Sequence, residues 1–127
     1  MAFSSLKERD SGMKYFEHLK KNNDFRNVYG KGKSQANKYL VMYFLENGLQ
    51  YNRLGISVSK KVGNSVVRHR LTRLIRESVR LNEERFELGY DIVIIARANL
   101  KGKGYRETES ALLHVSGLNN LLKRVDN

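Results

Sequence analysis

The chain has 127 residues, with 24 Lys and Arg against 13 Asp and Glu, so its formal net charge at pH 7 is +11. This length suits one domain, and a hydrophobic share of 40% is enough for one modest core. The absence of cysteine excludes disulfides and thiolate chemistry, and the positive balance makes nucleic acid the leading candidate for a partner.

The first residues are polar and lack hydrophobic periodicity, which predicts a disordered tail over residues 1 to about 13. A single domain then spans residues 14–127, and Met13 is an alternative to Met1 as the native start. No run approaches the roughly 20 apolar residues of a membrane span, and no apolar signal segment directs export. We therefore expect a cytoplasmic protein that has no membrane partner.

A short helix is the first element that the pattern predicts. Asn23 or Asp24 can cap it, and it extends to about residue 29. Its apolar side chains have the i, i+3, i+4 spacing of one helical face: Phe25, Val28 and Tyr29. The glycines and lysines of residues 30–34 then end the helix and form a basic loop.

Two strands follow this loop. The continuous apolar and aromatic run of residues 39–45 predicts the first strand. Its alternate residues face opposite sides, with Tyr39, Val41 and Tyr43 on one side and Leu40, Met42 and Phe44 on the other. The alternating run of residues 53–59 predicts the second strand, which pairs with the first as a hairpin through a turn region at residues 47–52. One face of the second strand has only the small residues Gly55, Ser57 and Ser59, which lets something large approach the sheet.

Residues 60–80 carry seven Lys or Arg and one acid. The apolar side chains between them keep helical spacing, so we expect a helix that has Asn64 or Ser65 as its N-cap and reaches about Leu81 or beyond. Its core face consists of Val67, Leu71, Leu74, Ile75, Ser78 and Leu81. The opposite face carries His69, Arg73, Arg76 and Arg80 in one stripe, with Arg68 and Arg70 on its flanks and Lys60 and Lys61 ahead of the helix.

A third strand and a last helix complete the predicted fold. Residues 90–96 are apolar on both faces of a strand, which indicates a central position in the sheet. Residues 101–104 form a flexible basic loop, and the last helix runs from Thr108 to about Lys123. Its inward residues are Ala111, Leu112, Val115, Leu118 and Leu122. The order α-β-β-α-β-α is an α+β fold, one small sheet packed against helices, whose crossover allows the second and third strands to be parallel.

The chain offers no constellation of catalytic or metal-binding residues. Its four Asp form no D-x-D or H-x-E cluster, and its three His are scattered at positions 18, 69 and 114. It has neither a phosphate-binding Gly-rich loop nor a G-x-S-x-G nucleophile motif. We therefore expect no catalytic residue and no metal site in this chain.

The stripe of like charges costs the predicted helix stability, and a polyanion that neutralises the charges removes this cost. A solvated surface helix and a membrane-lying helix are the alternatives, but the apolar face lacks Trp and Phe and is needed to cover the sheet. Neither a helix-turn-helix nor a zinc site is present, which favours single-stranded RNA over DNA. Phe25, Tyr29 and Tyr43, beside the small-residue strand face, suggest a groove where bases stack.

The segment from Arg53 to Glu77, which contains Lys-Lys-Val-Gly-Asn at residues 60–64 and Arg-His-Arg at residues 68–70, closely resembles the protein component of bacterial ribonuclease P. The resemblance extends to residues 19–25, 32–37 and 91–97 and covers residues 14–122 in the family's order. The family usually has Asn where this chain has His69. Both side chains can donate and accept hydrogen bonds, so His69 can keep a polar contact to RNA, and it gains a charge if protonated.

This resemblance implies an RNA-binding domain that serves as the protein subunit of a ribonucleoprotein, one that removes the 5′ leader from precursor tRNA. Catalysis and the Mg²⁺ ions then belong to the RNA subunit, and this chain alone holds no metal. The implied partners are the catalytic RNA and precursor tRNA, with no obligate protein partner. The family's fold is shared with a domain of a small-subunit ribosomal protein and has a left-handed β-α-β crossover, which the general handedness rule would not predict.

The resemblance also assigns site residues by motif position. Those that resemble the family's docking surface for the RNA subunit are Lys60, Lys61, Asn64, Arg68, His69, Arg70, Arg73 and Arg76. Those that resemble its cleft for the precursor-tRNA leader are Phe25, Tyr29 and Tyr43. A general RNA-binding chaperone, and a nuclease that needs no RNA cofactor, are the alternative functions.

Overall fold

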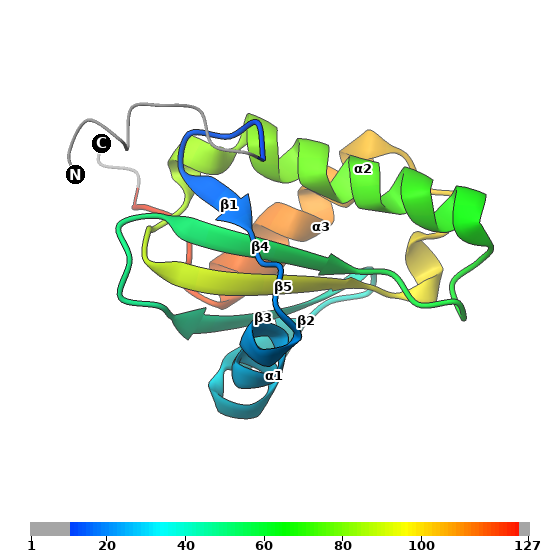
Figure 1. Cartoon of the computed structure of the whole chain (residues 1–127). Helices are drawn as coiled ribbons and strands as arrows, with labels where there is room; N and C mark the ends of the chain where they lie inside the picture. Colours follow the sequence, from blue (N-terminus) through cyan, green and yellow to red (C-terminus); the bar gives the residue numbers. More distant parts are fainter. Residues whose placement is uncertain (1–10, 125–127) are drawn as a thin grey trace.

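A five-stranded mixed sheet in the order β1-β4-β5-β3-β2 lies at the centre of the computed structural model, which describes residues 11–124 (Figure 1). The strands are β1 (Phe16–His18), β2 (Lys33–Ala36), β3 (Leu40–Glu46), β4 (Asn52–Ser57) and β5 (Tyr90–Ala96). The helices are α1 (Asn22–Lys31), α2 (Ser65–Leu81) and α3 (Tyr105–Leu118), with short 3-10 helices η2 (Glu83–Arg85) and η3 (Ala98–Leu100). The predicted α+β class is confirmed.

β5 occupies the middle of the sheet, as its apolar faces predict. It pairs in parallel with β4 and antiparallel with β3. The expected hairpin between β3 and β4 is therefore wrong, because β5 lies between these two strands. The physical reason is that a strand buried on both faces needs a neighbour on each edge to pair its backbone groups.

Two short strands, β1 and β2, were not predicted. β2 replaces part of the expected basic loop of residues 30–34, and all its residues are exposed, so it carries no hydrophobic pattern. It is recognisable only by its pairing with β3 at the sheet edge. β1 has three residues, of which Phe16 is fully buried against Phe86 with a ring-centroid distance of 5.6 Å. A pattern this short cannot be told from a loop.

The N-terminal boundary also differs from the prediction. Residues 1–10 of the expected tail lie outside the described residues. Met13, which the expected boundary assigns to the tail, is only 1% exposed and belongs to the hydrophobic core. The folded part therefore begins before residue 14.

α2 follows its prediction closely. Asn64 is its N-cap, and the Asn64 Oδ1 atom accepts a hydrogen bond from the Val67 N–H at 3.0 Å. The one difference is at the C-terminal end, where Leu81 is 56% exposed and Val79 is buried in its place. Leu81 is the last residue of the helix and lies beyond the part that α3 and the sheet cover.

α1 and α3 have different ends from those predicted. α1 begins after Lys21, which makes no side-chain capping bond, so the expected caps at Asn23 and Asp24 are wrong. α3 begins at residue 105 because Glu107 Oε1 accepts a hydrogen bond from the Gly104 N–H at 3.0 Å. It ends before residue 119, and Asn120 has a φ of 57°, which reverses the chain. Among the described residues, no helix is long and apolar enough to cross a membrane.

The helices cover both faces of the sheet, which gives three layers (Figure 1). α1 covers one face, where Val28 packs with Leu19 and Val93 in a small core. α2 and α3 cover the other face, where the larger core contains Leu71 and Leu112, both 0% exposed. The two faces are thus separate surfaces on which different ligands can bind.

Gly55 explains how closely α1 approaches the sheet. A Cβ atom at Gly55 would lie 2.5 Å from Cε1 and 2.6 Å from Cζ of Phe25. The large group that was expected to approach the small-residue face of β4 is therefore a side chain of α1 itself. A glycine at this position lets the Phe25 ring lie against the strand.

We expect Gly55→Ala to lower the free energy of unfolding by about 1–3 kcal/mol, because the new methyl group overlaps the Phe25 ring and forces it to move. Urea denaturation measures this change. Gly30→Ala is the matched control, since a Cβ at Gly30 of α1 meets nothing within 4 Å. Alanine there should stabilise the helix by up to about 1 kcal/mol. Equal stability of Gly55→Ala and the unaltered protein would contradict the proposed close contact.

Candidate nucleic-acid interface

α2 carries five of the predicted residues, which we call the cationic face: Arg68, His69, Arg70, Arg73 and Arg76. His69, Arg70 and Arg73 are exposed, whereas Arg68 and Arg76 are half-buried. Among the described residues, none of these four arginines forms an ion pair with a carboxylate. The exposed stripe was expected to include Arg80, but Glu77 Oε2 pairs with Arg80 Nη2 at 2.6 Å. The unneutralised charge of α2 is therefore concentrated on the cationic face.

The three remaining predicted residues lie at the start of α2. Lys60 and Lys61 are exposed in the segment that enters the helix, and Asn64 uses its Oδ1 atom as the N-cap. The first turn of α2 contains no acidic residue. Because the N-terminus of a helix carries a partial positive charge, this end of α2 adds to the attraction of anions.

A groove of about 540 Å³ runs beside the cationic face and is lined by Arg70, Arg73, Leu74 and Arg76, among others. The Nε atoms of Arg68 and Arg76 are buried and have no hydrogen-bond partner among the described residues. A buried donor without an acceptor costs roughly 1–3 kcal/mol. A phosphate that draws these guanidinium groups outward would give them acceptors, which favours an anionic ligand over a bare surface.

Phe25, Tyr29 and Tyr43 meet on the other face of the sheet, as predicted, and we call them the aromatic cluster. The ring centroids of Phe25 and Tyr29 are 6.5 Å apart, and those of Tyr29 and Tyr43 are 5.1 Å apart at 87°. Tyr29 is 41% exposed, whereas Phe25 and Tyr43 are half-buried. Tyr29 is thus the ring most available to a ligand, and Phe25 serves in part as its support.

The electrostatic state of Tyr29 suits contact with a polyanion. Partial burial, followed by the neighbouring Tyr43, raises the pKa of the Tyr29 phenol, against the smaller opposing effect of a hydrogen bond with Ser57. The phenol therefore stays neutral at physiological pH. A neutral ring offers an aromatic surface to a base without adding a negative charge beside the phosphates.

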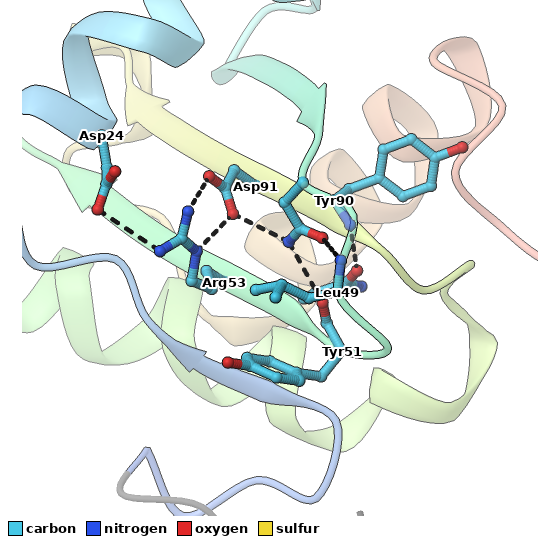
Figure 2. Close-up of polar contacts among 8 residues, drawn as sticks. Asp24, Leu49, Tyr51, Arg53, Tyr90 and Asp91 are labelled. Atoms are coloured by element: carbon cyan, nitrogen blue, oxygen red, sulfur yellow. Dashed lines mark hydrogen bonds and ion pairs between the residues drawn. The ribbon is translucent and has the colours of Figure 1, made fainter. Parts of the chain in front are cut away.

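An ion-pair network that sequence reasoning missed holds α1 to the sheet (Figure 2). Arg53 Nε donates to Asp91 Oδ1 at 2.7 Å, and Arg53 Nη2 donates to Asp91 Oδ2 at 2.6 Å. Arg53 Nη1 also lies 3.5 Å from Asp24 Oδ2 of α1. The signal that could have found the network is one charged residue in each of two otherwise uncharged strands, Arg53 in β4 and Asp91 in β5.

The same network fixes the connection between β3 and β4 (Figure 2). Asn47 Nδ2 donates to Asp91 Oδ1 at 3.0 Å and to the Tyr51 carbonyl at 3.3 Å. Asn47 Oδ1 accepts from the Leu49 N–H at 2.8 Å. Asp91 is only 5% exposed, so its carboxylate is satisfied by these donors rather than by water. These bonds therefore tie the connection between β3 and β4 to Asp91 of β5.

The described residues contain no group of three or more His, Cys, Asp or Glu side chains that could hold a metal ion. His69 and His114 lie on different helices, and no acidic cluster accompanies either of them. The surfaces described above have the chemistry of binding: cations, aromatic rings and helix dipoles.

Comparison with known proteins identifies relatives over almost the whole chain. The family model for ribonuclease P matches residues 13–124. The ribonuclease P protein component of Lachnoclostridium phytofermentans is 62% identical over 106 residues, which cover 84% of this chain and 91% of the relative. That of Alkaliphilus oremlandii is 53% identical over 110 residues, which cover 87% of this chain and 96% of the relative.

Solved structures agree with these relatives. The RNase P protein of Staphylococcus aureus has a TM-score of 0.78 at 38% identity, and the match covers 86% of this chain and 98% of that chain. The RNase P protein of Thermotoga maritima has a TM-score of 0.73 at 36% identity, with 87% and 99% covered.

We expect Asp91→Asn to lower the free energy of unfolding by about 2–3 kcal/mol, because Arg53 loses its charged partner. This is less than the roughly 3–5 kcal/mol of a fully buried pair, since the Arg53 side chain is 28% exposed. Urea denaturation measures the loss. Glu77→Gln is the control: it breaks an exposed pair on α2 and should cost at most about 0.5 kcal/mol. Similar losses in both variants would argue against the network as the anchor of α1.

Proposed function

Because this chain belongs to the bacterial ribonuclease P protein family, it is the protein subunit of the endoribonuclease that processes the 5′ end of tRNA, and we propose that the cationic face of α2 docks on the catalytic RNA of that enzyme. The observation that carries this proposal is the set of four arginines of α2 that form no ion pair with a carboxylate within residues 11–124. Binding to phosphates neutralises them and releases counterions from the RNA. A cytoplasmic location without an obligate protein partner is part of the proposal.

In this proposal, the cations of α2 reduce repulsion between two RNAs. Arg68, Arg70, Arg73 and Arg76 bind phosphates of the catalytic RNA, and Lys60 and Lys61 extend the positive surface past the helix N-terminus. His69 supplies a polar contact between Arg68 and Arg70. Mg²⁺ ions held by the RNA supply the chemistry of cleavage, and this chain contributes binding and charge neutralisation. Precursor tRNA, also a polyanion, can then approach with less electrostatic cost.

The aromatic cluster is proposed to bind the single-stranded leader of precursor tRNA. Support comes from the exposure of Tyr29 and from its neutral phenol. Unpaired bases stack on such rings without strong dependence on base identity. Phe25 contacts both Tyr29 and Gly55. In this proposal Phe25 therefore contributes both to the stability of the fold and to binding of the leader.

Reconstitution at low Mg²⁺ with a bacterial ribonuclease P RNA tests the docking proposal. The protein should stimulate 5′ processing of precursor tRNA, and Arg73→Gln should weaken its affinity for the RNA. A salt titration should show steep loss of affinity, with a slope that is shallower by about 1 in the variant because one phosphate contact is lost.

Lys123→Gln is the control in these measurements, since it removes one exposed charge beyond the end of α3. It should change neither the stimulation nor the slope. Absence of stimulation by the unaltered protein would overturn the proposal. Equal binding of many unrelated RNAs would favour a general chaperone, and cleavage without the RNA subunit would favour an autonomous nuclease.

We expect Tyr29→Leu to weaken binding of precursor tRNA with a long leader about 5- to 150-fold, the value of one stacked base. Binding of substrate that lacks the leader should be unchanged, since only the leader is proposed to reach the aromatic cluster. Equilibrium binding to the reconstituted enzyme over a series of leader lengths measures both.

Tyr29→Phe retains the ring and should bind like the unaltered protein. If Tyr29→Leu lowers the stability of the fold but leaves the dependence on leader length intact, the aromatic cluster is structural and the leader binds elsewhere.

A further inference from the structure

Another aromatic ring, with two cations near it, lies outside both surfaces described above. Tyr39 lies in the turn between β2 and β3, and the ammonium nitrogens of Lys38 and Lys103 lie 5.5 Å and 6.0 Å from its ring centroid. Its half-buried ring packs on the core beneath α2 and α3, not with Tyr43 as strand alternation predicts. The alternation fails because the regular strand begins only at Leu40.

The turn that contains Tyr39 is fixed by hydrogen bonds within the turn, to α3 and from Arg97. Asn37 Oδ1 accepts hydrogen bonds from the N–H groups of Tyr39 at 3.0 Å and Leu40 at 2.9 Å. Asn37 Nδ2 donates to the Ala111 carbonyl of α3 at 2.8 Å, and Arg97 Nη1 donates to the Asn37 carbonyl at 3.0 Å. The ring is therefore positioned before any ligand binds, which lowers the entropic cost of binding.

A groove of about 490 Å³ opens between this turn and α3, and we call it the Tyr39 groove. Lys38 and Tyr39 line it from the turn, and Arg106, Ser110 and His114 line it from α3. Its volume is in the range of small-ligand sites, about 300–1,000 Å³. The groove therefore combines an aromatic surface with positive side chains in a space that can hold one nucleotide.

The charges of this region favour an anion. Lys38, Lys103 and Arg106 form no ion pair with any carboxylate of the described residues. Glu107 also lines the groove, but its carboxylate accepts hydrogen bonds from backbone N–H groups at the start of α3, which together with the nearby Lys103 and Arg106 lower its pKa. Glu107 thus caps α3, and the three positive charges exceed its single negative charge.

His114 adds a hydrogen-bond donor. Its Nδ1 atom lies 3.2 Å from Asn37 Nδ2, and the bonds of Asn37 to backbone groups fix that amide nitrogen as the donor. Nδ1 must therefore be the acceptor, so the neutral ring carries its proton on Nε2. An Nε2–H group can donate to a phosphate oxygen or to a base edge.

We propose that the Tyr39 groove binds an unpaired nucleotide of the catalytic RNA, with the base on the Tyr39 ring and the adjoining phosphates on Lys38, Lys103 and Arg106. The inference rests on the proposed docking of α2. The catalytic RNA is the expected occupant because the groove region adjoins the cationic face: Arg70 of that face donates to the Lys103 carbonyl at 2.8 Å. The aromatic cluster, proposed to bind the leader, is on the opposite face of the sheet.

The lysines near the ring do not block a base. A cation over an exposed aromatic ring contributes about two- to fivefold to an equilibrium, whereas a stacked base contributes about 5- to 150-fold. Both lysines have long flexible side chains that can leave the ring and reach a phosphate. Base stacking therefore replaces the intramolecular contact with a stronger one.

Equilibrium binding of the full chain to a bacterial ribonuclease P RNA, without precursor tRNA, tests the proposal. Tyr39→Leu keeps apolar packing but removes the ring, and it should weaken binding at least about fivefold. Tyr39→Phe should restore binding. Lys38→Gln should make the salt dependence shallower by about 0.7–0.9, whereas the control Lys123→Gln should leave it unchanged. Thermal unfolding followed by circular dichroism checks that each variant is folded.

The outcomes separate this inference from the proposed function. Weaker binding by Arg73→Gln with no effect of Tyr39→Leu and Lys38→Gln overturns the Tyr39 groove and leaves the docking of α2 standing. No effect of any of the three overturns both. If Tyr39→Leu leaves binding of the catalytic RNA intact but removes the dependence of substrate binding on leader length, the groove binds the leader, which overturns the assignment to the catalytic RNA. If Tyr39→Leu fails to fold, an unchanged salt dependence of Lys38→Gln overturns the proposal.

Discussion

The bidentate contact between Arg53 and Asp91 joins β4 and β5, the two parallel strands between which the chain forms α2. These residues lie directly opposite each other in the sheet register although 38 positions separate them in the chain. Arg53 also reaches Asp24, so the same guanidinium sets the position of α1. Both proposed RNA surfaces therefore depend on one buried carboxylate, because it fixes the strands that flank the crossover and the helix that carries Phe25 and Tyr29.

α2 shows how a binding surface is maintained against its own repulsion. Leu71, Ile75 and Val79 bury its inner side almost completely, and burial of one such side chain contributes about 1.5–3 kcal/mol. Repulsion between like charges one helical turn apart costs only a few tenths of a kcal/mol per pair. The apolar side therefore outweighs the repulsion between the like charges on the outer side, and the helix keeps these arginines without losing its stability.

Features set by local pattern could be predicted from the sequence, and features set by distant pairing could not. The central place of β5 follows from five consecutive apolar residues after Asp91, and the start of α2 follows from Asn64. β2 was not predictable because its side chains are all exposed and only pairing with β3 defines it. The residues of the cationic face and the aromatic cluster could be named from helical spacing together with motif positions in the family resemblance. The Tyr39 groove could not be predicted, since its walls come from a turn and from α3, which lie far apart in the chain.

With the proposed roles of the cationic face and the aromatic cluster, their placement on opposite sides of one sheet makes the protein a bivalent tether. Two ligands can occupy it together without competing for the same atoms. In this proposal the catalytic RNA binds α2 on one face of the sheet, and the leader binds on the other face. The distance between the two faces then sets the effective concentration of the leader at its site, in place of the concentration of precursor tRNA in solution. In this proposal the protein contributes to the reaction through geometry, because it brings the two RNAs together within one complex.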